Sequence, residues 1–331
     1  MKNIILSMIL WSSALYADES KKTYELTWVL SHEPITLFEE AAKRFSHLAQ
    51  EKSQGQIKVK VVSAKKLYGS KVLPRQVYQK LIDGEIQMSQ GYTTALGQYS
   101  NPLWVLDLPF LFRDHNHASN VLDGKIGQDL LAGLEKSNIK GLAFTYSGGF
   151  RIIPSVTKEI NRYEDIKGMK VSIAQTPVFV ELYKKLGATP VAMSSLDIAR
   201  EQLVSKTADA SESTYPRFLP LEYDKVAGVV NETDHSLFLT SLIINKAYFD
   251  SLPKNIQRII SEAALEAGKL ERNLAIKSRP LEREQCLKKG IKVVAMSEKE
   301  KDRFKDFTKN LYKSLNQYFP ETLVTSIKNT K

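Results

Sequence analysis

Strand-like segments alternate with helical segments from residue 24 onward, and this alternation restricts the fold more than any other feature. Residues 24–30 and 57–61 have the pattern of half-buried strands, and a capping box at Thr36 begins a helix between them. The same patterns predict strands at 86–90, 141–146, 170–173 and 237–244, and helices at 72–82, 117–134, 177–186 and 195–205. Strands separated by helices at this spacing predict an α/β architecture.

The last third of the chain predicts one helix that is much longer than the others. Residues 254–288 place apolar side chains on one side at helical spacing. A helix of about 35 residues spans about 50 Å, which is longer than one small domain is wide. We therefore expect it to bridge two lobes, with a kink or an interruption at Pro280.

The composition indicates a folded chain with a substantial core. The 331 residues, 43% of them hydrophobic, suit one large or two ordinary domains. The net charge of +10 comes from lysines and arginines that are scattered rather than bunched, so we expect a solvated basic surface and no nucleic-acid partner. Cys286 is the only cysteine, which excludes an intramolecular disulfide and a metal site built from several cysteines.

The first residues have the layout of a secretory signal peptide. Lys2 supplies a positive start, residues 4–11 are apolar, and mostly small residues follow at 12–17. We expect cleavage after Ala17, with Ala14 as the alternative, so that residues 1–17 are removed from an exported, soluble chain. No cysteine follows the apolar segment, which excludes a bacterial lipid anchor. An uncleaved anchor is the other alternative, although the segment is short for a membrane span.

No catalytic or cofactor motif is visible. The chain has no GxSxG, P-loop, HExxH or dinucleotide-binding pattern. Residues 114–117 (DHNH) include metal-ligating types, but Asp114 suits the N-cap of the helix that follows, and no second ligand pair stands at a suitable spacing. Cys286 has no adjacent base and is interpreted as a packed thiol. We therefore expect no enzyme, no cofactor and no metal.

Several separated segments together resemble one protein family. They are 83–88 (DGEIQM), 108–114 (LPFLFRD), 149–151 (GFR), 163–171 (YEDIKGMKV), 186–193 (LGATPVAM) and 233–235 (TDH). In this order and spacing, with the long helix after them, they resemble the solute-binding proteins of TRAP transporters, the DctP family. The resemblance covers about residues 24–310.

The resemblance implies a two-lobed α/β periplasmic binding-protein fold, with a cleft between the lobes and the long C-terminal helix along both. Such a protein closes around a small organic acid in the periplasm and delivers it to a small and a large TRAP membrane subunit. We expect a monomer, with 18–148 and 236–275 in lobe I and 149–235 and 276–331 in lobe II. The identity of the acid stays open.

Arg151 is the first candidate for binding the acid. It follows Gly148 and Gly149 at the end of an expected strand, where the main chain can turn sharply toward a cleft. Its planar guanidinium matches the oxygens of a carboxylate. The resemblance implies the same role, because the GxR arginine of the family lines the carboxylate site.

Two positions depart from the family pattern. Ser172 stands where the family usually has a second arginine, its principal carboxylate anchor. Ser213 stands where an asparagine often follows the glutamate that is kept here as Glu212. Losing a fixed cation argues against a plain C4-dicarboxylate, because a second negative charge would lack compensation. We expect the ligand to fill the space that Ser172 leaves.

The remaining candidates follow from position alone. Ser31 and His32 end the first strand and Tyr92 ends another, at the edge where ligands bind in open α/β sheets. Tyr215 and Phe218 follow Glu212 along the chain. Each of these residues can equally be ordinary packing.

Three other functions share part of this pattern. A binding protein of an ATP-driven importer would share the two lobes but not the long helix or the GxR order. A stand-alone ligand sensor could use the whole sequence. A secreted hydrolase would need a nucleophile or a metal site that the sequence does not show.

Overall fold

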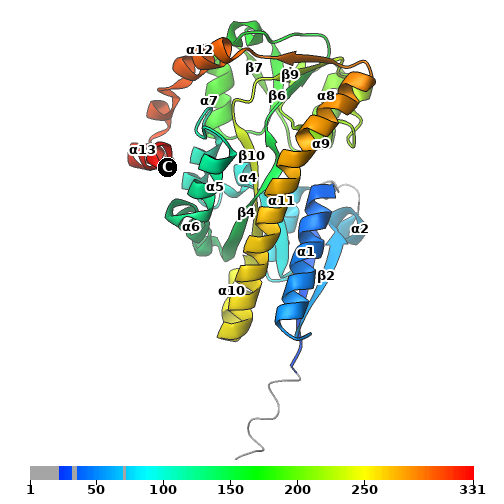
Figure 1. The fold of residues 1–331 in the computed structure, drawn as a ribbon, viewed down its shortest axis with the longest axis vertical. Helices are drawn as coiled ribbons and strands as arrows, with labels where there is room; N and C mark the ends of the chain where they lie inside the picture. The colour runs from blue at the N-terminus through cyan, green and yellow to red at the C-terminus, as the bar shows by residue number, and fades with distance from the viewer. Residues whose placement is uncertain (1–21, 32–35, 70–71) are drawn as a thin grey trace, which may run out of the picture.

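The computed structural model describes residues 22–31, 36–69 and 72–331, so the predicted signal peptide and His32 lie outside the described residues. The described chain forms two mixed β-sheets with helices around them, one above the other in Figure 1, and helix α11 runs along both. The predicted α/β architecture with two lobes is confirmed.

The first sheet has five strands in the order β2-β1-β3-β10-β4. They are β1 (Tyr24–Leu30), β2 (Ile57–Ser63), β3 (Met88–Tyr92), β4 (Ile139–Phe150) and β10 (Leu237–Asn245). Strand β1 pairs in parallel with β2 and β3, whereas β10 runs antiparallel to β3 and β4. Every residue of β10 is buried, as expected for a central strand that is covered on both faces.

The second sheet has six strands in the order β11-β9-β5-β8-β6-β7. They are β5 (Ile153–Ser155), β6 (Lys170–Ile173), β7 (Thr189–Ala192), β8 (Ala210–Ser211), β9 (Val229–Glu232) and β11 (Lys292–Ala295). Strand β6 pairs in parallel with β7 and β8, and β5 is antiparallel to β8 and β9. The sequence predicts only β6 among them, because it directly follows the turn at Gly168; the other strands have two to four residues and are too short to show a period of their own.

Helices pack around both sheets. Before the long helix they are α1 (Thr36–Lys52), α2 (Ala64–Tyr68), α3 (Pro74–Ile82), α4 (Thr93–Leu96), α5 (His115–Asp123), α6 (Lys125–Ala132), α7 (Pro177–Lys185), α8 (Leu196–Val204), α9 (Tyr215–Phe218) and α10 (Lys246–Ser251). The helix predicted at 117–134 is divided into α5 and α6, because Gly124 between them has an extended backbone. Asp114 caps α5 as predicted and accepts a hydrogen bond from the main-chain N–H of His117 at 2.8 Å.

Helix α11 (Lys254–Lys288) runs along both halves of the molecule (Figure 1). It packs against α1 and β4 in the first half and against α9 and β11 in the second. The helix continues through Pro280, so the predicted interruption does not occur there. Pro280 is exposed, and its neighbours Arg279 and Arg283 form salt bridges with Asp234 and Glu232 that hold this part of the helix on the second half.

The link from β4 to β5, the link from β9 to β10 and α11 each cross between the halves. The chain then ends with α12 (Glu298–Thr308) and α13 (Glu321–Asn329). Arg113, just before α5, donates to the main-chain carbonyls of Lys328 at 2.8 Å and Thr330 at 2.7 Å. The predicted lobe boundaries stay a prediction, and this contact places α13 beside the half that they assign to lobe I.

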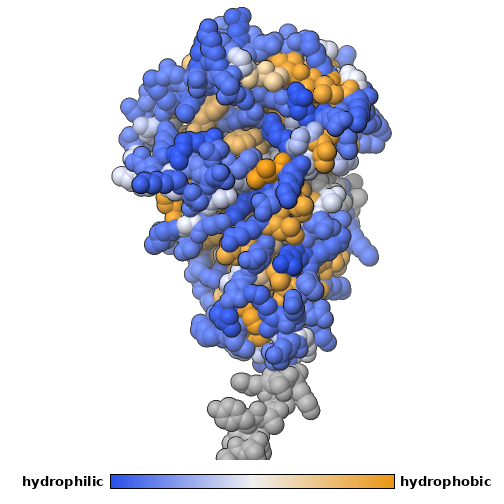
Figure 2. Space-filling model, viewed as in Figure 1, coloured by the Kyte–Doolittle hydropathy of each residue, from blue (hydrophilic) through white to orange (hydrophobic). Residues whose placement is uncertain are grey.

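The face of the molecule seen in Figure 2 is mostly hydrophilic, with apolar side chains in groups between hydrophilic ones. The large apolar side chains exposed over the described surface are Val61, Leu67, Val204, Leu265, Leu281 and Leu287. Within the described ranges, no helix combines the length and the apolar composition that a membrane span requires.

Candidate functional site

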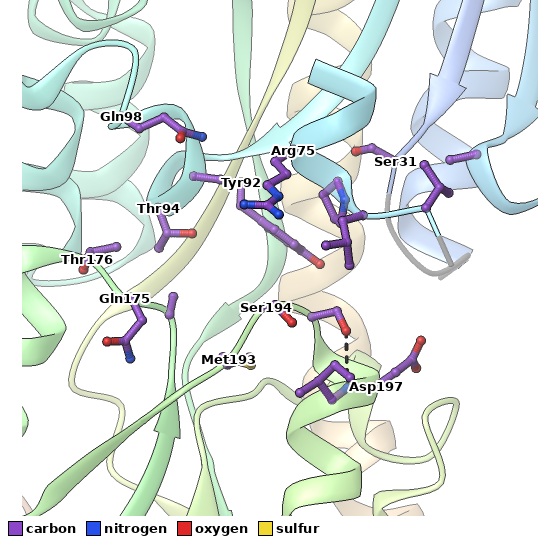
Figure 3. A pocket seen from close by; sticks show the side chains of 18 of the residues that line it. Ser31, Arg75, Tyr92, Thr94, Gln98, Gln175, Thr176, Met193, Ser194 and Asp197 are labelled. Atoms are coloured by element: carbon purple, nitrogen blue, oxygen red, sulfur yellow. Dashed lines mark hydrogen bonds between the residues drawn. The ribbon is translucent and has the colours of Figure 1, made fainter. Parts of the chain in front are cut away.

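A cavity of about 830 Å³ lies between the two halves, a size typical of small-molecule sites. Its lining includes Ser31, Arg75, Tyr92, Thr94 and Gln98 from the first half, and Gln175, Thr176, Met193, Ser194 and Asp197 from the second. Figure 3 shows these side chains on opposite sides of the space. Lys65 of α2 and Asp197 of α8 form a salt bridge of 3.3 Å at this cavity, so the two halves touch there.

Arg151 is fully buried at the point where the chain leaves β4. The main chain reaches it through Gly148 and Gly149, whose φ angles of 104° and 86° favour glycine. The guanidinium carbon lies 3.8 Å from the centre of the Phe238 ring, and Phe238 lines the cavity. Nη1 donates to Glu212 at 3.4 Å, whereas Nε and Nη2 have no hydrogen-bond partner among the described residues. The guanidinium fork is therefore only partly used by the protein.

Glu212 is the centre of a buried cluster around Arg151. Its Oε1 accepts a hydrogen bond from the Tyr183 hydroxyl and lies 3.0 Å from His235 Nε2, while Oε2 faces Arg151. Burial alone would raise the pKa of Glu212, but these three partners lower it to about 2, with His235 contributing most. Glu212 is therefore ionised at neutral pH and compensates a positive charge next to it.

Asp107 places a second carboxyl group near Arg151 and titrates in the opposite sense. It is fully buried at the end of the 3₁₀ helix Asn101–Asp107, and its Oδ2 has no hydrogen-bond partner among the described residues. Burial raises the pKa of Asp107 to about 7, although the charge of Arg151 and a hydrogen bond from Thr176 act to lower it. The two carboxyl groups therefore differ in charge over most of the acidic range.

A second buried arginine, Arg217 in α9, lines the cavity and is absent from the sequence candidates. Its Nε donates to the Ser147 hydroxyl at 2.9 Å. Its guanidinium carbon lies 5.2 Å from the centre of the Tyr92 ring and 5.6 Å from that of Phe238. Nη1 and Nη2 have no hydrogen-bond partner in the part of the chain that the structure describes. Arg151 and Arg217 thus both lie next to Phe238.

The two positions that depart from the family pattern are buried in the second half. Ser172 in β6 does not line the cavity, and its hydroxyl donates to Oε1 of Gln202 in α8 at 2.6 Å. Ser213 pairs through its main chain with Ile152, and its hydroxyl has no partner among the described residues. A free hydroxyl therefore remains next to Glu212, whereas the Ser172 hydroxyl is used within the protein.

Ser31, which follows β1, and Tyr92, which ends β3, both line the cavity. The Ser31 hydroxyl donates to the main-chain carbonyl of Gln90 at 2.7 Å, which joins Ser31 to β3. Tyr92 stacks on Phe238 with ring centres 4.9 Å apart. The cavity therefore contacts the carboxyl ends of these strands, as the position of the residues predicts.

Tyr215 and Phe218 belong to the packed core behind the cavity and do not line it. The Tyr215 hydroxyl donates to Glu232 at 2.8 Å, and burial raises its pKa above the ordinary value. Both residues fix the short helix α9 that carries Arg217. His32, the remaining candidate, lies outside the described residues.

The family model for DctP, described as bacterial extracellular solute-binding protein, family 7, matches residues 30–318. The chain belongs to the DctP family. The 2,3-diketo-L-gulonate-binding periplasmic protein YiaO of Escherichia coli is 30% identical over 254 residues, which are 77% of this chain and 76% of that protein. The C4-dicarboxylate-binding protein DctB of Bacillus subtilis is 27% identical over 288 residues, 87% of this chain and 81% of that one.

A solved structure at 28% identity supports the DctP fold. The TRAP periplasmic solute-binding protein from Bradyrhizobium, in complex with α/β-D-galacturonate, gives a TM-score of 0.83 and covers 93% of this chain and 100% of that chain. The Ralstonia eutropha protein with bound (S)-2-acetolactate, at 25% identity, gives 0.82 and covers 92% and 98%. The DctP family and its fold are those of solute-binding receptors rather than enzymes.

Proposed function

We propose that this chain is the periplasmic solute-binding subunit of a TRAP transporter. It captures a small organic acid by closure of its two lobes and delivers the acid to a small and a large membrane subunit. The observation that carries the proposal is the cavity between the halves of a DctP fold: the buried Arg217 lines it, and the buried Arg151 lies behind it over the ring of the lining residue Phe238. A buried guanidinium with unused N–H groups favours a carboxylate partner.

The chemistry of the relatives supports the class of ligand. YiaO is a 2,3-diketo-L-gulonate-binding protein, and the Bradyrhizobium and Ralstonia structures contain galacturonate and 2-acetolactate. All three ligands are organic acids. Residues 1–17 would act as a cleaved signal peptide that exports the chain to the periplasm, where periplasmic relatives such as YiaO are found.

Eight of the nine candidate residues have a role in this proposal. Arg151 donates from Nε and Nη2 to the acid group of the ligand, and Glu212 holds its guanidinium in place. Tyr92 and Ser31 contact the ligand from the first half, and Ser213 offers its hydroxyl from the second. Tyr215, Phe218 and Ser172 do not contact the ligand; they support the elements behind the cavity. The nine candidates are Arg151, Ser172, Glu212, Ser213, Tyr92, Ser31, His32, Tyr215 and Phe218, and His32 is the one that lies outside the described residues.

A thermal-shift screen of the mature chain from Asp18 tests the function. A ligand that binds only the folded state raises the melting temperature, by about 5 °C at 100 times its Kd for a protein of this size. The panel is galacturonate, galactonate, D-erythronate, pantoate and succinate, the ligands of solved relatives. We expect at least one acid to give this shift. Small-angle scattering with that acid should then show a smaller radius of gyration, because the lobes close.

Two results would contradict the proposal. If no organic acid in the panel, or in a wider set of organic acids, raised the melting temperature, the ligand class would be wrong. If scattering profiles with and without a saturating acid were identical, capture by lobe closure would be wrong. Adjacent genes for one small and one large membrane subunit separate transport from a stand-alone sensor of the same fold.

Ser172→Arg puts back the residue that is usual at this position in the family. We expect it to weaken binding of the native acid at least tenfold and to lower the melting temperature. The reason is space: Ser172 is fully buried against Gln202, and overpacking costs about 1–3 kcal/mol before the added charge is counted. Calorimetric titration and thermal unfolding measure both effects. Ser172→Ala, which removes only the hydroxyl, is the matched control, and unchanged affinity in Ser172→Arg would show that position 172 does not influence the ligand site from behind the cavity.

A further inference from the structure

Arg217 is held in place by the same glycine turn that carries Arg151. A Cβ at Gly148 would lie 2.5 Å from Thr214 Oγ1 and 2.8 Å from a carbon of Pro216, so only glycine allows β4 to approach this segment so closely. The Thr214 hydroxyl donates to the Ser147 carbonyl at 2.6 Å, and Arg217 Nε donates to the Ser147 hydroxyl at 2.9 Å. The side chain is therefore fixed at the cavity wall by one end of its guanidinium.

No described residue compensates the positive charge of this guanidinium. The structure describes three buried arginines, and two have a carboxylate: Arg151 pairs with Glu212 at 3.4 Å, and Arg272 pairs with Asp123 at 2.9 Å. Arg217 has no salt bridge with any described residue, and its Nη1 and Nη2 have no hydrogen-bond partner there. An unpaired buried charge is costly, so a site that keeps one is organised for a charged ligand.

The buried carboxyl group of Glu271 does not supply the missing charge. Both oxygens of Glu271 accept hydrogen bonds from Gln90 Nε2, at 2.9 and 3.0 Å, and not from Arg217. Burial raises the pKa of Glu271 well above its ordinary value, against the opposing effect of the Arg217 charge, and so favours the neutral form of the group. Burial also lowers the pKa of Arg217, as expected for a cation without a close partner.

We propose that Arg217 binds the carboxylate of a ligand that carries a single negative charge. The inference rests on the proposed solute-binding function, and it names Arg217 as the residue whose charge pairs with the ligand. Glu212 already compensates Arg151, so one positive charge in this cluster remains for the ligand, and Arg151 contributes hydrogen bonds to the same acid group. The two guanidinium groups then bind one carboxylate beside the Phe238 ring.

The rest of the cavity suits the neutral part of such a ligand. Most polar side chains of its lining are uncharged: Ser31, Tyr92, Thr94, Gln98, Gln175, Thr176, Ser194 and Ser195. Hydroxyl and amide groups satisfy hydroxyl and carbonyl groups without adding charge. The ligand is therefore a monocarboxylic acid with hydroxyl or carbonyl groups, and a dicarboxylate would bring one charge too many.

The experiment compares Arg217→Met with the wild type, using the best acid of the panel and its primary amide as a matched pair. The affinity for the acid should fall by about 30-fold or more, because the charge partner is lost, while affinity for the amide should change little. The apo variant should melt no lower than the wild type, since it no longer buries an unpaired charge. Acetate at fixed ionic strength, with acetamide and chloride as references, is a second probe that does not depend on the panel, and it should stabilise only the wild type.

Arg75→Gln tests the competing cation of the cavity. Arg75 also lines it but is exposed, so solvent screens its charge and the expected loss of affinity is threefold or less. Three results would each overturn the inference. The first is a larger loss of affinity in Arg75→Gln than in Arg217→Met, and the second is an equal loss for acid and amide in Arg217→Met. The third is tighter binding of succinate than of every monocarboxylate. If acetate alone behaves as expected while no panel acid binds, Arg217 is an anion site and the proposed ligand class fails instead.

Discussion

Arg151→Ala is expected to weaken binding of the ligand acid by about two orders of magnitude. The substitution removes two donor nitrogens, Nε and Nη2, that have no hydrogen-bond partner among the described residues. A hydrogen bond to a charged group contributes about 1.5–3 kcal/mol, so losing this fork should cost about 3 kcal/mol, or about 100-fold in Kd. Arg151→Lys should also bind weakly, because an ammonium cannot reproduce the planar fork. Calorimetric titration with the acid found in the screen measures both variants.

Arg151→Ala also leaves Glu212 without its arginine, so a loss of stability must be separated from a loss of binding. Arg272→Ala is the matched control, because Arg272 is also buried and paired, with Asp123, but donates to the main-chain carbonyl of Phe144 in β4, whereas Arg151 lies over the cavity residue Phe238. It should lower the melting temperature and leave the Kd unchanged. Unchanged affinity in Arg151→Ala would move the acid site away from the GxR arginine.

The long elements of the fold could be predicted because their hydrophobic period is repeated many times. Residues 254–288 are α11, and 24–30 are β1, as the sequence predicts. The division of 117–134 at Gly124 could not be predicted, since the apolar positions on either side keep a helical spacing. Pro280 does not break α11 because ion pairs of the adjacent arginines hold the helix on both sides of it.

The second sheet shows the limit of sequence reasoning more clearly. Strand β8 has two residues and β5 has three, and their order in the sheet depends on pairings such as Ser155 with Ala210. Such pairings join residues that are far apart in the chain, and no local pattern specifies them. The sheet nevertheless places Ser172 and Glu212 together behind the cavity, because the main-chain N–H of Glu212 donates to the Ser172 carbonyl at 3.0 Å.

The candidate site was predictable where the backbone itself carries a signal. The pair Gly148 and Gly149 indicates the turn at Arg151, and the strand ends indicate Ser31 and Tyr92. Arg217 was missed because a single arginine is ordinarily a surface residue. The one available signal is that it stands between Pro216 and Phe218 in an otherwise uncharged segment, and its burial follows only from the approach of β4.

Glu212→Gln is expected to destabilise the apo protein by about 3–5 kcal/mol at pH 7, because it removes one partner of a buried ionic cluster. The pKa of Glu212 is lowered from 4.5 to about 2 in the folded state by His235, Arg151 and Tyr183, against the effect of burial. A carboxyl group with a lowered folded pKa adds stability that is complete above pH 4.5 and is lost as the pH falls toward 2, about 3 kcal/mol in all. Urea unfolding at intervals of pH measures this dependence.

The difference in stability between the wild type and Glu212→Gln should therefore shrink as the pH falls from 4.5 toward 2. Glu262→Gln is the control, because Glu262 forms a partly exposed salt bridge with Lys52 and should change the pH dependence little. If Glu212→Gln kept the acid dependence of the wild type, Glu212 would not be the ionised centre of the cluster. Glu212 would then not compensate the charge of Arg151, and the conclusion that a single positive charge remains for the ligand would be wrong.

Asp107→Asn should change the pH dependence of stability in the opposite direction. Burial raises the pKa of Asp107 to about 7, so the wild type loses stability as the pH rises from about 4 to 7, and the variant should not.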